Sequence, residues 1–233
     1  MTPTQPTGGY DEPTLVEDLM LLLFLPRSGT IAGENTLFYV LAGAVLTDLA
    51  LEGLVKVGEE TDIGRGRLQT VGARPPSDSL LRSVWEYVDE KPRRVQTVLA
   101  AMGPPLRQPV LDRLVRRGDI DRTDRKVLLF KTHALSEGQT GRRDRLLQDV
   151  RQALVEGQAP VARVAALAGL LSGSGWLHQL HPEIPWNSAV ISRGKEFERG
   201  AWGAGAAAEA VTRTVTATVV SSVVVASAVV PRG

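Results

Sequence analysis

The chain has 233 residues, of which 43% are hydrophobic and 23% charged, so it can bury a core, and gross disorder is excluded. Lys and Arg number 27 and Asp and Glu 26, and the resulting net charge of +1 excludes a strongly cationic surface for nucleic acid. The absence of cysteine excludes disulfides, thiol catalysis and thiolate metal sites. Because His133, His178 and His181 are the only imidazoles, we expect neither an enzyme nor a bound metal or cofactor.

The first part of the chain predicts a lead-in followed by two helices. Residues 1–13 are polar and rich in Pro and Gly, and we expect them to be a disordered lead-in to one domain at 14–230. Thr14 and Glu17 have the spacing of a capping box, which predicts a helix over 15–25 that ends before Pro26. Apolar residues then recur every three or four positions over 35–52, which predicts a second helix closed by Gly53.

In the middle of the chain, the sequence pattern predicts two successive units of helix, hairpin and helix. Short segments with Val at 54–57 and 67–71 predict a hairpin after the second helix, and a further helix is expected over 79–90. A helix over 108–117 then ends at Gly118, an apolar strand is expected at 127–130, and a helix follows over 142–156. Either the chain contains an internal duplication, or both helices end at Gly before a strand as helices commonly do.

The last third is rich in Ala, and we expect helices over 161–171 and 201–230. Residues 214–230 carry no charge and reach the lower edge of the length that spans a bilayer. Several Ser and Thr residues dilute the hydrophobicity of this segment, and it ends without a basic stop region, so we expect it to pack on the protein. A tail anchor and a frayed tail are the alternatives.

Two blocks of sequence carry a family resemblance. They read TLVEDLMLL at residues 14–22 and LAGAVLTDLALEG at 41–53, and shorter matches follow at 73–81, 114–118 and 127–130. These blocks resemble the Golgi phosphoprotein 3 family, of which the bacterial branch is the most similar. The resemblance covers about residues 14–230.

The resemblance implies a fold and a function. The implied fold is mainly α: a single globular helical domain with a central helix bundle and short β-hairpins. The implied function is that of a peripheral membrane protein, cytoplasmic or on the cytoplasmic face of a membrane, which binds phosphatidylinositol 4-phosphate. Eukaryotic members also hold the cytoplasmic tails of membrane glycosyltransferases, and no enzymatic activity is implied.

The family's headgroup pocket maps onto four positions of this chain. It uses a Trp in the loop after the first helix, an Arg on the next helix and two Arg residues three apart, and these fall on Gly33, Ala42, Pro104 and Arg107. Arg107 alone retains the family's residue. A hydrogen bond to a charged group contributes about 1.5–3 kcal/mol to binding, so the loss of the family's other arginines weakens the predicted pocket. We therefore expect weak binding of anionic lipids in general rather than specific recognition of phosphatidylinositol 4-phosphate.

Two further groups of residues complete the predicted site. Arg113, Arg116 and Arg117 share a helix face by their spacing, and we expect them to help Arg107 bind lipid, with an ordinary solvated face as the alternative. The stretch 122–133 matches an oligomerisation hairpin of the family. Its apolar residues are predicted to make a homo-oligomer, with an ordinary buried strand as the alternative; they are Val127, Leu128, Leu129 and Phe130.

Other classes of function remain as alternatives. The leading one is a protein-interaction or scaffold module that self-associates through the hairpin and has lost lipid binding, and an unidentified protein partner fits this function or the first. Gly118 and the hairpin after it also resemble the end of a winged-helix module, but the near-neutral charge leads us to expect no nucleic acid partner. His178 and His181 do not form a zinc motif, because no Glu follows the first His and Pro182 breaks any helix there.

Overall fold

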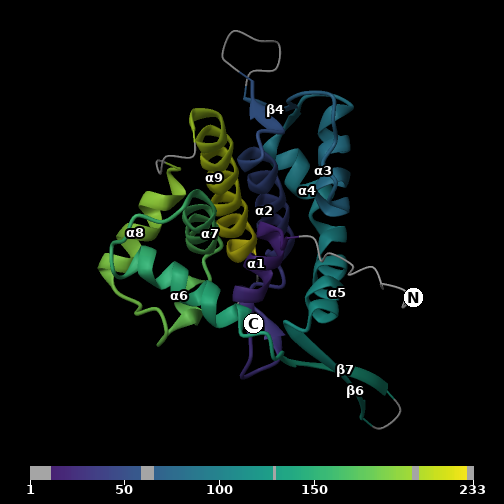
Figure 1. Cartoon of the computed structure of the whole chain (residues 1–233), viewed down its shortest axis with the longest axis vertical. Coiled ribbons are helices and arrows are strands. Elements are labelled where there is room, and N and C mark those ends of the chain that lie inside the picture. Colours follow the sequence, from purple (N-terminus) through teal and green to yellow (C-terminus); the bar gives the residue numbers. More distant parts are fainter. Residues whose placement is uncertain (1–11, 59–65, 128–129, 201–204, 230–233) are drawn as a thin grey trace, which may run out of the picture.

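The computed structural model describes residues 12–58, 66–127, 130–200 and 205–229, and it is mainly α-helical, as predicted (Figure 1). The α-helices are α1 (Leu15–Leu23), α2 (Leu37–Leu51), α3 (Ser79–Asp89), α4 (Val95–Met102), α5 (Arg107–Arg117), α6 (Arg142–Leu154), α7 (Ala162–Gly173), α8 (Ser188–Glu198) and α9 (Ala206–Val229). Two 3-10 helices, η1 (Pro104–Leu106) and η2 (Leu177–Leu180), precede α5 and follow α7. The predicted lead-in at 1–13 lies almost entirely outside the described residues.

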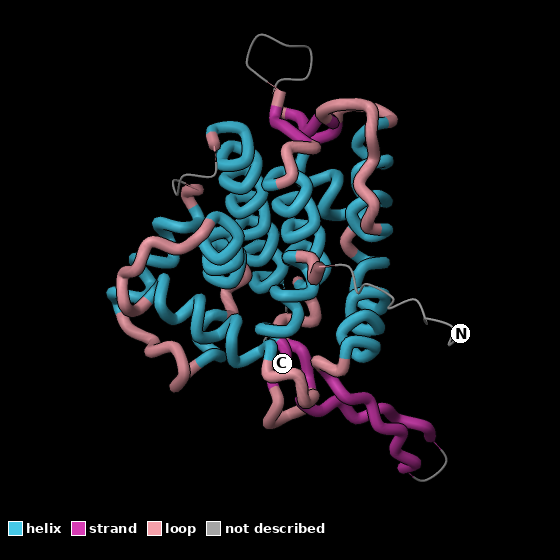
Figure 2. Tube along the Cα trace, in the orientation of Figure 1, coloured by secondary structure: helices cyan, strands magenta, loops and turns pink. Residues whose placement is uncertain are grey.

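The described strands form three small antiparallel sheets at the two ends of the helical body (Figure 2). They are β1 (Phe24–Leu25) with β2 (Thr30–Ile31), then β3 (Val55–Val57), β4 (Arg67–Thr70) and β5 (Arg93–Arg94) in that order, and β6 (Ile120–Val127) with β7 (Phe130–Glu137). The hairpin after α2 is confirmed, and it gains β5 as a third strand that the sequence analysis missed.

The predicted apolar strand at 127–130 is wrong. Val127 ends β6 and pairs directly with Phe130, which begins β7, so the two ends of this run belong to two antiparallel strands rather than to one strand. Residues 128 and 129 lie outside the described residues. The resemblance did indicate a hairpin here, and β6 and β7 extend away from the helices (Figure 1). Self-association through its tip stays a prediction.

The core is built around α1 and α2, whose sequences are apolar on nearly every side. Such helices are stable only when neighbours surround them. Every residue of α1 is buried, and α2 contacts α1, α3, α4, α7 and α9. The predicted helix over 15–25 ends two residues early, because the chain leaves α1 at Phe24 to pair with β2. Gly53 closes α2 with a φ of 72°, as predicted.

Helix α9 packs on the protein between Ala208 and Ser222, whereas Val224 and Val225 are exposed, so the packing predicted for 214–230 is found for the first part of that segment. It contacts α2, α7, α4 and β3, and it buries Val211, Val215 and Val219. Its first residues lie beside the far end of α2, whereas Val223 and Ala226 share a pocket with Thr36, so the two helices run antiparallel. Among the described residues, Ala206–Ala226 is the one helical segment long and apolar enough to cross a membrane. Of the 18-residue apolar stretch within it, 33% is buried in the protein.

Candidate functional site

The four predicted lipid-binding arginines lie at two separate places on α5. Arg107 begins the helix, where its Nε donates to Glu34 Oε2 at 2.8 Å and its terminal nitrogen donates to the other carboxylate oxygen. This two-pronged pair is partly exposed, and the hydrogen bonds to Glu34 raise the pKa of Arg107. Arg113 and Arg117 lie further along α5, away from this pair, and Arg116 is exposed.

Arg113 and Arg117 face the N-terminal turn of α1. Arg117 Nε donates to Glu17 Oε1 at 3.0 Å, while Arg113 lies 3.6 Å from Glu17 Oε2 and 2.5 Å from Asp78. The Glu17 side chain is 0% exposed, and its Oε2 also accepts from the backbone N–H and hydroxyl of Thr14. The predicted helical face therefore exists, but two of its three arginines bind a buried carboxylate.

The same arrangement continues at the next residue of α1, Asp18, and extends to α2, α6 and α7. Arg142 bridges Asp18 and Asp119, at 2.6 Å from the latter, and Arg163 lies 2.6 Å from Asp18 and 3.2 Å from Asp48. We call this set of charged residues the ionic cluster. Its members are Glu17, Asp18, Asp48, Asp119, Arg113, Arg117, Arg142 and Arg163.

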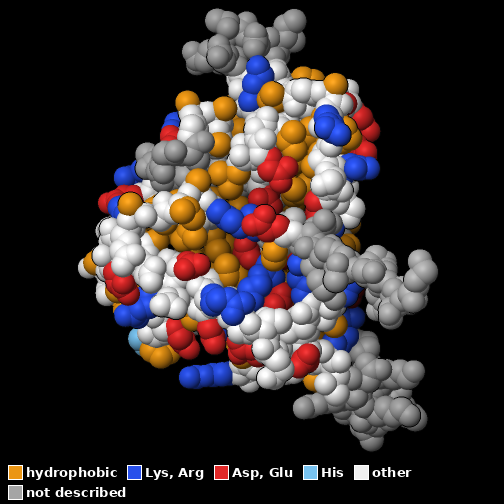
Figure 3. Space-filling view, in the orientation of Figure 1, with side chains coloured by type: hydrophobic (Ala, Val, Ile, Leu, Met, Phe, Trp, Pro, Cys, Tyr) orange, Lys and Arg blue, Asp and Glu red, His pale blue; other side chains and the backbone are white. Residues whose placement is uncertain are grey.

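The ionic cluster joins five helices through charges of both signs. Figure 3 shows Lys and Arg side chains adjoining Asp and Glu across the middle of one face, with neither sign gathered into a broad patch. The carboxylates of the cluster are buried, and burial raises the pKa of Asp48, against which the charge of Arg163 acts. The blocks at 14–22 and 41–53 thus carry residues that hold the fold together.

An acidic hollow of about 480 Å³ adjoins the cluster, lined in part by Asp48, Glu52, Asp78 and Arg163. Partial burial, together with the charges of Asp48 and Asp78, raises the pKa of Glu52. As the pH falls, the folded protein therefore takes up this proton before the unfolded chain does. The ionised Glu52 opposes folding at neutral pH, and this effect disappears as the pH falls through the raised pKa.

Replacing Glu52 by glutamine is therefore expected to raise the melting temperature slightly at pH 7, with the gain lost at about pH 4. Thermal unfolding at the two pH values measures this difference. Glu86→Gln, on an exposed position of α3, is the control for loss of one negative charge. A Glu52→Gln protein that is less stable than the original at pH 7 would contradict the assignment.

A second hollow, of about 320 Å³, lies where α2 begins and where α7 and α9 end. It includes Gly33, onto which the resemblance maps a residue of the family's headgroup pocket, and we use that name for it. Its lining residues are Gly33, Glu34, Asn35, Thr36, Ser174, Gly175, Trp176, Val223 and Ala226. The indole of Trp176 covers Gly33 so closely that a Cβ there would lie 2.4 Å from the indole Nε1. Gly33 also has a φ of 73°, which side-chain-bearing residues rarely adopt.

Trp176 occupies the space above the position at which the resembled family has its own Trp. The two differ in origin, because Trp176 follows α7 whereas Gly33 precedes α2. Ala42 is completely buried in α2, where an Arg has no access to this pocket without a change in packing, and Pro104 lies in η1. Sequence reasoning did not pair Trp176 with Gly33, since only the fold brings residues 33 and 176 together.

The headgroup pocket combines the partial positive charge of a helix N-terminus with one carboxylate, that of Glu34. Asn35 and Thr36 bring the N-terminal end of α2 to the pocket, and the helix dipole places partial positive charge there. The Thr36 side chain makes no capping bond to the first turn; its hydroxyl donates to the Gly33 carbonyl at 3.2 Å. Glu34 lines the same pocket and holds Arg107, so the arginine and a competing carboxylate meet at its edge.

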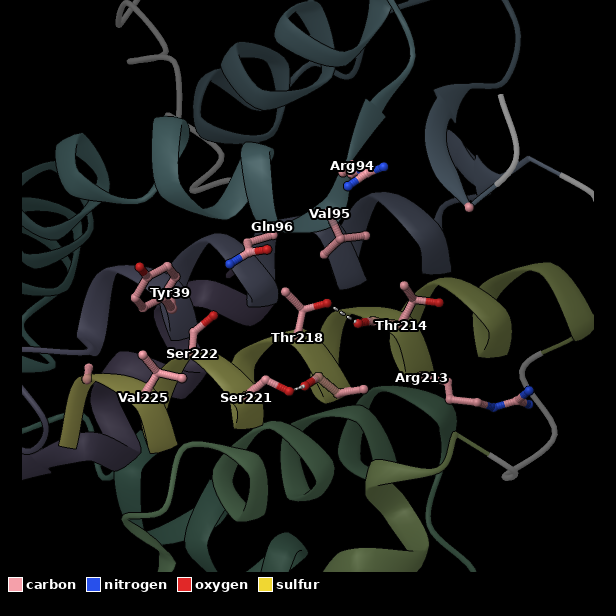
Figure 4. A pocket seen from close by; sticks show the side chains of 13 residues that line it. Tyr39, Arg94, Val95, Gln96, Arg213, Thr214, Thr218, Ser221, Ser222 and Val225 are labelled. Carbon is pink, nitrogen blue, oxygen red and sulfur yellow. Dashed lines mark hydrogen bonds between the residues drawn. The ribbon is translucent and has the colours of Figure 1, made fainter. Parts of the chain in front are cut away.

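A third hollow is a groove of about 1010 Å³ along α9 (Figure 4). Arg94, Val95 and Gln96 line one wall, and hydroxyl-bearing residues of α9 line the other. The hydroxyls of Thr214, Thr218 and Ser221 donate to backbone carbonyls four residues earlier in α9. They therefore fulfil their donor capacity within the helix, and they add little specificity to the groove.

Within the described residues, no group of three His, Asp or Glu side chains is arranged to hold a metal ion.

Comparison with known proteins identifies the family of the chain. No curated protein matches the chain. The sequence model described as Golgi phosphoprotein 3 (GPP34) matches residues 15–214, which is most of the chain and includes the ionic cluster, the headgroup pocket as far as Trp176, and the hairpin. The chain belongs to the Golgi phosphoprotein 3 family.

Proposed function

We propose that this protein is a peripheral membrane protein that binds anionic phospholipid headgroups in the headgroup pocket, on the cytoplasmic face of a membrane. The observation that carries the proposal is the indole of Trp176 lying against Gly33, the position onto which the resemblance maps the Trp of the family's lipid site. Phosphatidylinositol 4-phosphate is the ligand that the resemblance implies. Phosphatidylglycerol and cardiolipin are the anionic lipids that a pocket with a single arginine suits better.

Arg107 supplies the cation in this proposal. It retains the family's residue, its guanidinium can present two parallel donors to a phosphate, and its partner Glu34 lines the pocket. In the structure, the Glu34 carboxylate occupies the place beside the Arg107 guanidinium that a lipid phosphate would take. A phosphate must therefore displace the Glu34 carboxylate, which weakens its apparent affinity.

The other predicted arginines have different parts in the proposal. Arg113 and Arg117 bind Glu17, and moving them toward a lipid would leave a buried carboxylate without its partners. Arg116 is exposed and remains a candidate for weak electrostatic help near an anionic surface. The proposal therefore assigns lipid binding to Arg107 at the first turn of α5, with a weaker electrostatic contribution from Arg116.

Arg107→Ala is expected to weaken sedimentation with anionic vesicles about tenfold, the effect of losing one charged hydrogen bond. Glu34→Gln is expected to strengthen it, because the glutamine competes less well for Arg107. Vesicles of neutral lipid, phosphatidylglycerol, cardiolipin and phosphatidylinositol 4-phosphate, at low and physiological salt, give the measurement. Binding confined to phosphatidylinositol 4-phosphate would mean that other residues of this pocket replace the arginines that the family has at positions 42 and 104.

The matched control is Arg94→Ala, which removes the same charge from β5, at the opposite end of α2 from the pocket. It is expected to leave binding nearly unchanged at physiological salt. Equal losses from Arg107→Ala and Arg94→Ala would indicate diffuse attraction and defeat the proposal of a pocket. Vesicle binding that ignores both Arg107 and Glu34 would defeat it as well.

A further inference from the structure

Exposed apolar side chains gather beside the headgroup pocket. The exposed large hydrophobic residues of the described chain are Val71, Val155, Val161, Trp186, Val224 and Val225. Val224 and Val225, 62% and 64% exposed, belong to the last turns of α9, whose neighbours Val223 and Ala226 line the pocket. Trp186 is 49% exposed and is connected to the pocket through two aromatic rings.

These rings form a continuous row. The Trp176 ring, which lines the pocket, stacks on His178 with centroids 5.7 Å apart and an interplanar angle of 28°. His178 in turn meets Trp186 edge to face at 5.8 Å. Hydrogen bonds fix the middle ring, because its two nitrogens contact the Gly175 carbonyl at 3.1 Å and the Gln179 amide at 3.0 Å. We call Trp176, His178 and Trp186 the aromatic row.

Tryptophan and histidine combine an apolar ring with a polar N–H. This chemistry suits the layer between the acyl chains and the headgroups of a bilayer, where one part of the ring is dry and another is wet. A single electrostatic contact holds a protein on a membrane only weakly and reversibly, whereas a second, apolar contact makes binding stable. The headgroup pocket, with one arginine, is such a weak contact by itself.

A phospholipid headgroup is presented only at the surface of its bilayer. Residues on the rim of a pocket that receives the headgroup therefore meet the membrane when the pocket is filled. Trp176 belongs to the pocket, and Trp186 extends the aromatic row outward from it. We infer, on the basis of the proposed function, that the aromatic row enters the interfacial layer of an anionic bilayer, with Trp186 as the inserting side chain and the end of α9 beside it.

The experiment places bromine atoms on the lipid acyl chains next to the headgroup and records the quenching of tryptophan fluorescence. Vesicles of brominated phosphatidylglycerol are expected to quench the full-length protein, and Trp186→Phe is expected to remove most of that quenching. In sedimentation, Trp186→Ser is expected to lower binding about tenfold, since about half of a Trp side chain loses its apolar contact. The loss is expected to persist at physiological salt, because the contact is apolar.

Val161→Ser is the matched control. Val161 is 70% exposed but precedes α7, whereas Trp176 follows the other end of that helix. The substitution is expected to leave vesicle binding unchanged, and circular dichroism checks that each variant is folded. Equal losses from Trp186→Ser and Val161→Ser would overturn the inference.

The remaining outcomes separate the two proposals. Binding that depends on Arg107 but leaves Trp186 unquenched overturns the aromatic row and keeps the headgroup pocket. Absence of binding to every anionic vesicle overturns both. A change from dimer to monomer in Trp186→Ser, measured by light scattering, assigns the row to contact between two copies of the chain and overturns the membrane inference.

Discussion

Replacing Glu17 by alanine is expected to lower the free energy of unfolding by about 3–5 kcal/mol, the usual effect of removing one partner from a buried ion pair. The Glu17 carboxylate has no exposure to water, and it binds Arg117, Arg113 and the capping groups of Thr14. Its removal leaves the Arg117 guanidinium without this partner and leaves the Thr14 N–H unpaired. Urea unfolding at pH 7, followed by circular dichroism, measures the change.

Glu34→Gln is the matched control for Glu17, because it weakens an arginine pair that is partly open to solvent. Such pairs contribute about 0–1 kcal/mol, so this substitution is expected to alter stability little. The same variant is also the one expected to strengthen vesicle binding, which separates the fold from the function. Similar losses for the two substitutions would show that the ionic cluster adds no more than a surface pair.

Replacing Gly43 by leucine is expected to destabilise the protein by about 3 kcal/mol, at the upper end of typical overpacking. A Cβ at Gly43 would already lie 3.0 Å from Val219 and 3.1 Å from Val215, so a larger side chain forces α9 away from α2. Urea unfolding and limited proteolysis within α9 give two independent measurements. The result also tests where α9 resides, because only a helix packed on α2 meets this side chain.

Ala217→Leu provides the control for Gly43→Leu. Ala217 is exposed on α9 and lines the groove, so the added atoms enter solvent or open space. The expected change is within about 0.5 kcal/mol. If Gly43→Leu is equally harmless, the packing of α9 against α2 is not the arrangement present in solution.

The sequence predicted the helices whose patterns are strong and local. The capping box at Thr14, the apolar run of α2 and the glycines at 53 and 118 all indicate boundaries close to those observed. Helices α4 and α8 were not predicted: α4 has only eight residues, and α8 contains Gly194, which weakens a helical pattern. The apolar run at 127–130 predicts one strand, because four consecutive apolar residues give the same sequence pattern whether they belong to one strand or to the facing ends of two strands.

The site was less predictable than the fold. Arg107 was identified through the family resemblance, whereas the pairing of Glu17 with Arg117 joins residues 100 positions apart and has no local pattern. The spacing of Arg113, Arg116 and Arg117 predicts a shared face, but amphipathicity alone does not say that Arg113 and Arg117 meet a buried carboxylate while Arg116 meets solvent. The contact of Trp176 with Gly33 is equally hard to predict, because the two residues are far apart in the sequence.

The pairing of Arg107 with Glu34 has a consequence for how the protein would distinguish one membrane from another. The carboxylate is tethered to the chain, so it competes with lipid phosphate at a fixed local concentration that no dilution of the protein can reduce. A lone anionic lipid in a mostly neutral bilayer competes poorly with such a rival. Under the proposed function, a surface crowded with anionic headgroups would replace it readily, and occupancy would then rise with the density of negative charge across the bilayer.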